Sequence, residues 1–154
     1  MKALPFKGTR ILALALALLG SGRSALAEAP KENASFKIGL IYPKTGPLAP
    51  YAQSLANAVR LGLYEFRRDK PELGAKVAVV VADDKSLATE AVIAGERLIQ
   101  SQNIAVLVGS LSNTANYDLI PILEAKKIPL LLPKGFDEGL LVKSSHVFSM
   151  TPTD

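Results

Sequence analysis

Short apolar runs alternate with longer segments of helical period from Phe36 onward. The runs hold Val, Ile and Leu at nearly consecutive positions, which is typical of strands buried on both faces of a parallel sheet. We therefore predict strands at Phe36–Tyr42, Ala75–Ala82, Ile104–Gly109, Ile128–Leu132 and, on a weaker pattern, His146–Met150.

The segments between these runs predict three helices, at about Tyr51–Arg68, Leu87–Ser101 and Thr114–Lys126. Pro121 falls inside the third helix, where it predicts a kink or a short break. Two of the helices carry apolar residues every three or four positions, on a face expected to lie on the sheet. These residues are Leu55, Val59, Gly62, Leu63 and Phe66 in the first helix and Ala91, Ala94, Leu98 and Ile99 in the second.

Residues at the ends of these helices predict where each one begins. Ser86 is a candidate N-cap of the second helix, and Ser112 or Asn113 is a candidate N-cap of the third. Pro50 is expected to keep the loop before the first helix non-helical.

Strand and helix alternate strictly along the chain, which predicts the fold class. An α/β fold is expected, with a doubly wound, mostly parallel sheet, right-handed crossovers and helices on both faces. Such a fold serves many functions, so function has to be argued from the loops that follow the strands.

The first 27 residues have the three parts of a secretory signal peptide. A positive segment precedes the apolar run Ile11–Leu19, and Ala25-Leu26-Ala27 is a small-x-small cleavage site. The apolar run is much shorter than the roughly 20 residues that span a bilayer, so no permanent membrane anchor is expected. We predict cleavage after Ala27, a flexible mature N-terminus over 28–35 and a periplasmic protein.

The net charge of +4 belongs to that leader, which holds four of the 18 basic residues and no acidic one. Fourteen basic and 14 acidic side chains remain in the mature part, so no basic face argues for nucleic acid. The nearest thing to a basic run is Arg67, Arg68 and Lys70, which is expected to be a solvated helix end.

The chemistry of common enzymes is missing from the strand-end loops. The chain has no Cys, and the loop of residues 43–51 has neither G-x-G-x-x-G nor a P-loop lysine. His146 is the only histidine and lacks a G-x-S-x-G partner motif. Asp83 and Asp84 are expected to cap the following helix rather than to hold a metal. We predict no enzyme activity, no cofactor and no metal site.

The loop of residues 109–114 is small and rich in hydroxyl groups, and it leads straight into the third predicted helix. Free N–H groups at a helix start, with hydroxyl donors beside them, suit a carboxylate or another oxyanion. Plain N-capping explains the same residues without a ligand, so both interpretations stay open. The candidate residues are Ser110, Leu111, Ser112, Asn113 and Thr114.

The mature sequence resembles the leucine/isoleucine/valine-binding family of periplasmic solute-binding proteins of ABC transporters. The resemblance is carried by short stretches that follow one another in order over about 120 residues. They are Phe36–Leu40, Thr45–Pro47 with Tyr51, Asp83–Ser86, Gly109–Ser112, Ile128–Pro133 and Val147–Asp154. It implies two α/β lobes that close on a small solute, of which residues 36–154 would be an incomplete first lobe, without the second.

The resemblance also implies a ligand-binding site around Tyr51 and the 110–114 loop. After Pro133, amino-acid-binding members present a carbonyl and a threonine, whereas this sequence has Lys134, Gly135 and Phe136. A lysine there would oppose an ammonium group. We therefore expect an anionic or aromatic solute, with Lys134 as its counter-charge and Tyr51 and Phe136 as apolar walls. The alternative is that Lys134 points to solvent and Phe136 fills the lobe.

The function implied is capture of a small molecule, amino-acid-like or another organic or aromatic acid, for an ABC importer. The expected partners are this solute and a membrane permease. A ligand-sensing or cell-envelope regulatory protein of the same fold is the alternative.

Overall fold

The computed structural model describes residues 34–133, 139 and 144–151, and it contains five strands in this part of the chain. All five match predicted strands, although β2, β3 and β4 each begin two residues after the predicted start. The expected leader 1–27 and most of segment 28–35 lie outside the described residues. The strands are β1 (Phe36–Tyr42), β2 (Val77–Asp83), β3 (Val106–Val108), β4 (Leu130–Leu132) and β5 (Val147–Ser149).

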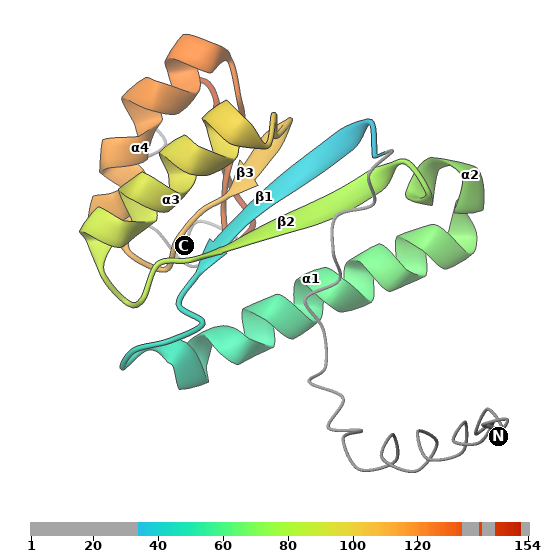
Figure 1. Ribbon diagram of the computed structural model, residues 1–154, viewed down its shortest axis with the longest axis horizontal. Helices are drawn as coiled ribbons and strands as arrows, with labels where there is room; N and C mark the ends of the chain where they lie inside the picture. Colours follow the sequence, from blue (N-terminus) through green and yellow to red (C-terminus); the bar gives the residue numbers. More distant parts are fainter. Residues whose placement is uncertain (1–33, 134–138, 140–143, 152–154) are drawn as a thin grey trace, which may run out of the picture.

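The strands form a single sheet in the order β2-β1-β3-β4-β5 (Figure 1), and every neighbouring pair is parallel. The register is continuous across its centre, where Ile38 of β1 pairs with Val79 of β2 and with Val106 of β3. This arrangement confirms the predicted α/β class with a doubly wound parallel sheet.

Helices cover both faces of the sheet, as the alternating pattern predicted. Figure 1 shows α1 on one face, with α3 and α4 together on the other. The helices are α1 (Ala49–Asp69), the short α2 (Pro71–Gly74), α3 (Ala88–Ser101) and α4 (Asn113–Lys126).

The larger core lies between the sheet and the α3–α4 layer. Burial of its aliphatic side chains is the main favourable term for folding, at about 25 cal/mol per Å² of apolar surface. All four residues that the sequence placed on the inner face of the second helix are buried here. The largest side chains of this core are Ile41, Leu98, Ile99, Ile104, Leu107, Leu119, Ile120, Leu123, Ile128, Leu130 and Leu132.

The core beneath α1 is smaller, and the predicted stripe of that helix is only partly buried. Ala52 and Ala56 lie fully inside, and Leu55 and Val59 pack against them half-buried. Gly62 and Phe66 are exposed, contrary to the prediction. The 21 residues of α1 span about 31 Å, whereas the seven of β1 span about 23 Å, so the far end of the helix has little sheet to cover.

One prediction made from proline was wrong, and another was wrong in part. Pro50 lies in the first turn of α1 instead of the loop, where its missing N–H costs nothing. The second was a kink or a short break at Pro121; helix α4 continues through Pro121 without a break, with the buried Ile120 and Leu123 on either side of it.

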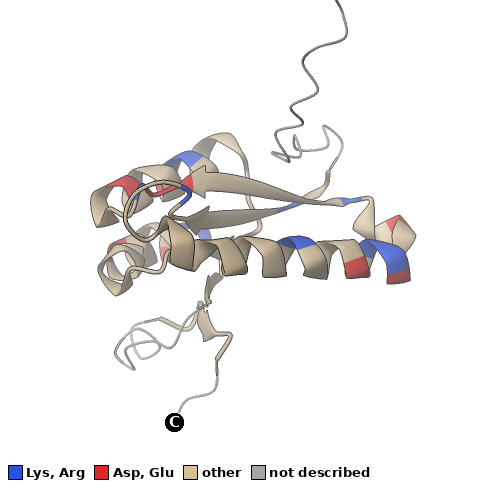
Figure 2. Ribbon diagram, turned by 90° about the horizontal axis from the view of Figure 1, so that it is seen from below, with Lys and Arg blue, Asp and Glu red and all other residues tan. Residues whose placement is uncertain are grey.

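The basic end of α1 also differs from the prediction of a solvated terminus. Arg67 is half-buried and donates hydrogen bonds to the carbonyl oxygens of Gly74 and Val77, at 3.3 and 3.1 Å. Arg68 pairs with Asp69 in solvent at 2.8 Å. Figure 2 shows both signs of charge together at this end of α1, which leaves no uniform basic surface there.

Candidate ligand-binding site

The loops that follow the strands leave the sheet at one edge, because all five strands are parallel. The chain goes from β1 to β2 on one side and then returns to β3 on the other side of β1, so the order reverses between β1 and β3. Ligands of open α/β sheets bind at the carboxyl edge beside such a switch point. The loops after β1, β2 and β3 therefore define the candidate site.

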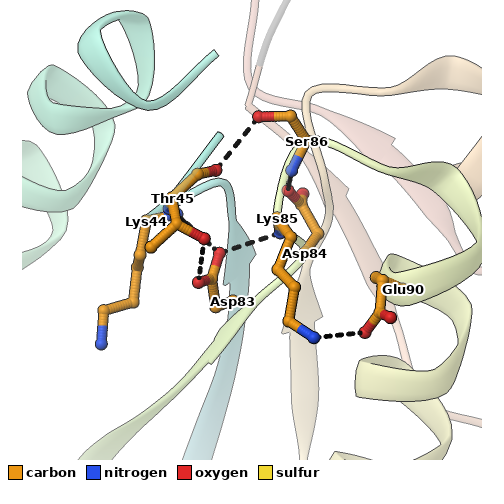
Figure 3. A network of polar contacts seen from close by, with 7 residues as sticks. All are labelled: Lys44, Thr45, Asp83, Asp84, Lys85, Ser86 and Glu90. Carbon is orange, nitrogen blue, oxygen red and sulfur yellow. Dashed lines mark hydrogen bonds and ion pairs between the residues drawn. The ribbon is translucent and has the colours of Figure 1, made fainter. Parts of the chain in front are cut away.

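Asp83, at the end of β2, gathers the loop that follows β1 (Figure 3). One carboxylate oxygen accepts from the N–H groups of Lys44, Thr45 and Lys85, at 2.9, 3.3 and 2.9 Å. The other accepts from the Thr45 hydroxyl at 2.8 Å. Four donors on one carboxylate fix the loop after β1 against the loop after β2.

These donors also set the protonation of Asp83. Its partial burial raises the pKa, but the hydrogen bonds from Lys85, Thr45 and Lys44 favour the charged form more strongly. The pKa of Asp83 therefore lies below its ordinary value. The side chain is a carboxylate at neutral pH, as its acceptor role requires.

Ser86 makes a second connection between the same two loops. Its hydroxyl donates to the carbonyl of Thr45 at 3.1 Å and accepts from the N–H of Leu48 at 3.0 Å. Gly46 lies directly against it with φ +89°, and a Cβ there would approach Lys85 O and Ser86 Oγ to 2.6 Å. Only glycine fits this contact without moving backbone.

The turn that carries Ser86 has an unusual backbone. Lys85 and Ser86 both have left-handed φ values, 51° and 65°, which are costly for residues with a Cβ. The turn is closed by a 2.8 Å hydrogen bond from Leu87 N–H to Asp84 O. The side chain of Lys85 pairs with Glu90 at 3.2 Å.

The turn overturns two capping predictions. Helix α3 begins after Leu87 and has no side-chain cap, so neither Ser86 nor the two aspartates cap it. Ser86 and Asp83 bind the loop after β1 instead, and Asp84 bonds to the Ser86 N–H and the Ser110 hydroxyl, at 2.9 and 2.7 Å. Tertiary contacts therefore replace the local ones that the sequence favoured.

The loop after β3 leads into α4, and Ser112 caps that helix, which confirms one of the two predicted N-caps. Its hydroxyl accepts from Ala115 N–H at 3.4 Å, while its carbonyl accepts the first intrahelical bond from Asn116 N–H. The N–H groups of Asn113 and Thr114 precede that bond and point out of the helix end. Both residues are exposed at the edge of the sheet.

The structure brings Ser110, Ser112, Asn113 and Thr114 together, and Leu111 packs half-buried on the α1 side of the sheet. Tyr51 stands in the first turn of α1 with 75% of its surface exposed. Three further expected site residues, Lys134, Gly135 and Phe136, lie outside the described residues.

Sequence reasoning missed four residues of this edge as parts of a common network: Thr45, Asp83, Asp84 and Asn116. Asn116 is buried, donates to Ser110 O at 2.9 Å and has no hydrogen-bond partner for its Oδ1 among the described residues. The signal that could have indicated this network was the Asp83-Asp84 pair directly after a predicted strand. Two other strand-end loops of the same sheet carry hydroxyl groups that could donate to these carboxylates.

Within the described residues, no group of three or more His, Cys, Asp or Glu side chains could hold a metal ion. None of the helices in this part of the chain is long and apolar enough to cross a membrane.

Comparison with known proteins places this fold in one class. The chain belongs to the periplasmic binding protein family, which it matches over residues 35–154. The matched segment contains the whole described sheet and every loop of the candidate site.

A curated relative is the Leu/Ile/Val-binding protein BraC3 of Rhizobium johnstonii, 28% identical over 110 residues and covering 71% of this chain. Two solved structures are each 26% identical and cover 74% of this chain. They are leucine-binding LivK from Thermotoga maritima, with a TM-score of 0.61, and a solute-binding protein of an ABC transporter from Rhodopseudomonas palustris in complex with benzoate, with a TM-score of 0.59. The chain covers 30% of the first and 32% of each of the others, about a third of their lengths.

Proposed function

We propose that this chain is the first lobe of a solute-binding protein that captures a small carboxylic acid for an ABC importer. The observation that carries the proposal is the start of α4 at the carboxyl edge of the sheet. There the exposed N–H groups of Asn113 and Thr114 and the hydroxyl of Ser112 offer donors at the positive end of a helix. A carboxylate is the ligand group that matches these donors.

The relatives support the same ligand class. One is described as binding leucine, isoleucine and valine, one as binding leucine, and one is in complex with benzoate. These compounds share a carboxylate and differ in whether an ammonium group accompanies it. The common carboxylate fits the start of α4.

The finer choice of ligand rests on Lys134 and Phe136. Lys134 follows Pro133, at the end of the strand next to β3, and would repel an ammonium group while attracting an anion. With Tyr51 and Phe136 as apolar walls, the site would favour an aromatic or other simple acid over an α-amino acid. A binding role without catalysis accords with membership of a family of binding proteins.

Transport also sets the location and the partner in this proposal. The leader pattern of residues 1–27 directs the chain to the periplasm, where the solute would be handed to a membrane permease. The family match begins at residue 35, just behind the expected leader and the short segment after it.

An NMR titration of the 154-residue chain tests the proposed ligand class, because it also detects weak binding. Benzoate is expected to shift the backbone amide signals of Asn113 and Thr114, whereas the neutral isostere benzamide leaves them in place. Leucine is expected to shift them less than benzoate does. If neither acid moves these two amides, the proposed site is wrong.

A further inference from the structure

Asp84 is the only charged side chain among the buried residues of the described chain, with 2% of its surface exposed. It follows β2 at the edge of the sheet, yet its carboxylate accepts from Ser110 beyond β3 at 2.7 Å. Strand β1 lies between these two strands, so the contact spans the switch point. Asp84 therefore links the loop after β2 to the loop after β3 across the end of β1.

Ser110 uses its hydroxyl entirely within the protein. The proton is donated to Asp84, while the oxygen accepts from Ser112 N–H at 3.1 Å. The side chain is also buried, with 3% of its surface exposed. A ligand could take a hydrogen bond from this hydroxyl only by breaking the one to Asp84.

The bonds around Ser110 determine how α4 starts. Ser112, whose N–H is held by Ser110, is the N-cap of α4. In the second turn of the same helix, Asn116 Nδ2 donates to Ser110 O at 2.9 Å. Ser110 is thus bound to two points of α4 and to Asp84, and a shift of its hydroxyl would shift the helix start that carries Asn113 and Thr114.

The other oxygen of Asp84 holds the left-handed turn after β2. It accepts from Ser86 N–H at 2.9 Å, and Ser86 in turn binds the loop after β1. The nearby cation Lys85 is paired with Glu90, so hydrogen bonds rather than an ion pair satisfy the buried carboxylate. A single buried side chain therefore links the loops of three strands.

We propose that Asp84 and Ser110 are positioning residues of the ligand site. Asp84 orients the Ser110 hydroxyl, and Ser110 fixes Ser112 so that the N–H groups of Asn113 and Thr114 face the ligand. Buried hydrogen bonds of this kind rigidify a site, and among the buried side-chain polar atoms of the described residues Asn116 Oδ1 is the one left without a partner. This assignment rests on the proposed function for its effect on binding, but the link between the residues can be measured without any ligand.

Amide hydrogen exchange in the ligand-free 154-residue chain tests the link itself. Asp84→Ala removes the acceptor of Ser86 N–H, so faster exchange there is expected from direct contact alone. Ser112 N–H does not touch Asp84, and we expect its exchange to accelerate by about tenfold as Ser110 loses its orientation, the size expected for one hydrogen bond. Unchanged exchange at Ser112 in Asp84→Ala would overturn the proposal.

Benzoate titrations then test the effect on binding. Ser110→Ala is the variant used, because it removes only one hydroxyl group. Ser144→Ala is a matched control. Ser144 is also buried, and its hydroxyl accepts a hydrogen bond from His146 N–H at 3.1 Å. It precedes β5, so it lies at the amino end of the strands, away from the site. Both variants are expected to lower the melting temperature. Only Ser110→Ala is expected to weaken benzoate binding, by about tenfold.

The two results separate this inference from the proposed function. If the unaltered chain binds no benzoate, the function proposed above fails, while the exchange of Ser112 still decides whether Asp84 acts through Ser110. If benzoate binds and Ser110→Ala leaves its affinity unchanged, or Ser144→Ala weakens it equally, the positioning role is wrong.

Discussion

The hydroxyl of Thr45 donates a 2.8 Å hydrogen bond to the carboxylate of Asp83, although the two residues stand 38 positions apart in the chain. Together with three backbone N–H donors, this bond ties the loop after β1 to the loop after β2. The Asp83 carboxylate is the common acceptor, so both its presence and its charge should matter for stability.

We expect Asp83→Asn to lower the free energy of unfolding by about 1 kcal/mol at pH 7, a modest value because the pair is partly solvated. Thr45→Val removes one of the four donors and should lower the free energy of unfolding by a smaller amount. Urea denaturation of the three proteins measures both differences. An Asp83→Asn variant as stable as the original chain would contradict the role of this carboxylate.

The difference in stability between the original chain and Asp83→Asn should depend on pH, because the pKa of Asp83 is lowered. A depressed pKa contributes stability that is fully present above the unfolded value of about 3.9 and is lost as the pH falls through the folded value. The gap in stability between the original chain and Asp83→Asn should therefore shrink from about pH 5 to about pH 3. A gap that stays constant over this range would mean that Asp83 acts only through its shape.

Gly46 and Gly62 form a matched pair for substitution by alanine. At Gly46, φ is +89° and a new Cβ would meet Lys85 O at 2.6 Å, so Gly46→Ala should destabilise the chain by about 1–3 kcal/mol. At Gly62, in the middle of α1, nothing lies within 4 Å of a new Cβ. Gly62→Ala should therefore stabilise the chain by about 0.5–1 kcal/mol. Thermal unfolding of both variants gives the signs, and equal signs would contradict the packing around Gly46.

The fold was predictable because its strands and helices follow from local periodicity. Continuous apolar runs predicted all five strands, and the four inward residues of α3 were recognised from their spacing. The stripe on α1 was less accurate, since periodicity does not tell how much sheet lies under a long helix. Ala52 and Ala56 became its buried centre instead.

The polar network of the site was not predictable in the same way. An aspartate or serine before a helix has a good local partner in that helix, so capping was the natural expectation for Asp83, Asp84 and Ser86. Which partner wins depends on strand order, because only the arrangement β2-β1-β3 brings these side chains near Thr45 and Ser110. Local sequence does not contain that order.

Gly95 and Leu119 pack so closely that their sizes should be coupled. A Cβ on Gly95 of α3 would lie 2.4 Å from Leu119 Cδ2 of α4. Gly95→Ala is expected to cost about 1–3 kcal/mol by overpacking. Leu119→Val alone should cost about 1 kcal/mol by removing buried methylene volume. The double variant should be more stable than the sum of the two losses predicts, and a double-mutant cycle measures this. Strict additivity would show that α3 and α4 can move apart at this point.

The expected leader provides a prediction that is independent of the fold. When the whole chain is expressed in a Gram-negative host, export should remove residues 1–27, because the small-x-small site ends at Ala27. Mass spectrometry of the periplasmic fraction should find Glu28 as the N-terminus. Replacement of Ala25 and Ala27 by bulky residues should block this cleavage, while an intact Met1 in the cytosol for the original chain would contradict periplasmic export.

The last prediction concerns Lys134, the charge that we propose selects the ligand. Lys134→Ala should weaken benzoate binding by roughly 1–3 kcal/mol, the usual cost of removing a hydrogen-bonded charged partner from an anion. Titration of the 154-residue chain followed through the Asn113 and Thr114 amides measures the change. The affinity for leucine should fall much less than the affinity for benzoate, or should rise, because the leucine ammonium group no longer meets a cation in Lys134→Ala.

Lys126→Ala is the matched control for this lysine. Lys126 is exposed in the last turn of α4, at the end of the helix away from the site, so its removal changes the net charge equally without touching the ligand. Benzoate affinity should be unchanged in Lys126→Ala, and added salt should reduce the affinity of the original chain only modestly if the contact is shielded from solvent. Equal losses in both variants would mean that the ligand responds to overall charge, and benzoate binding that survives Lys134→Ala would remove Lys134 from the site.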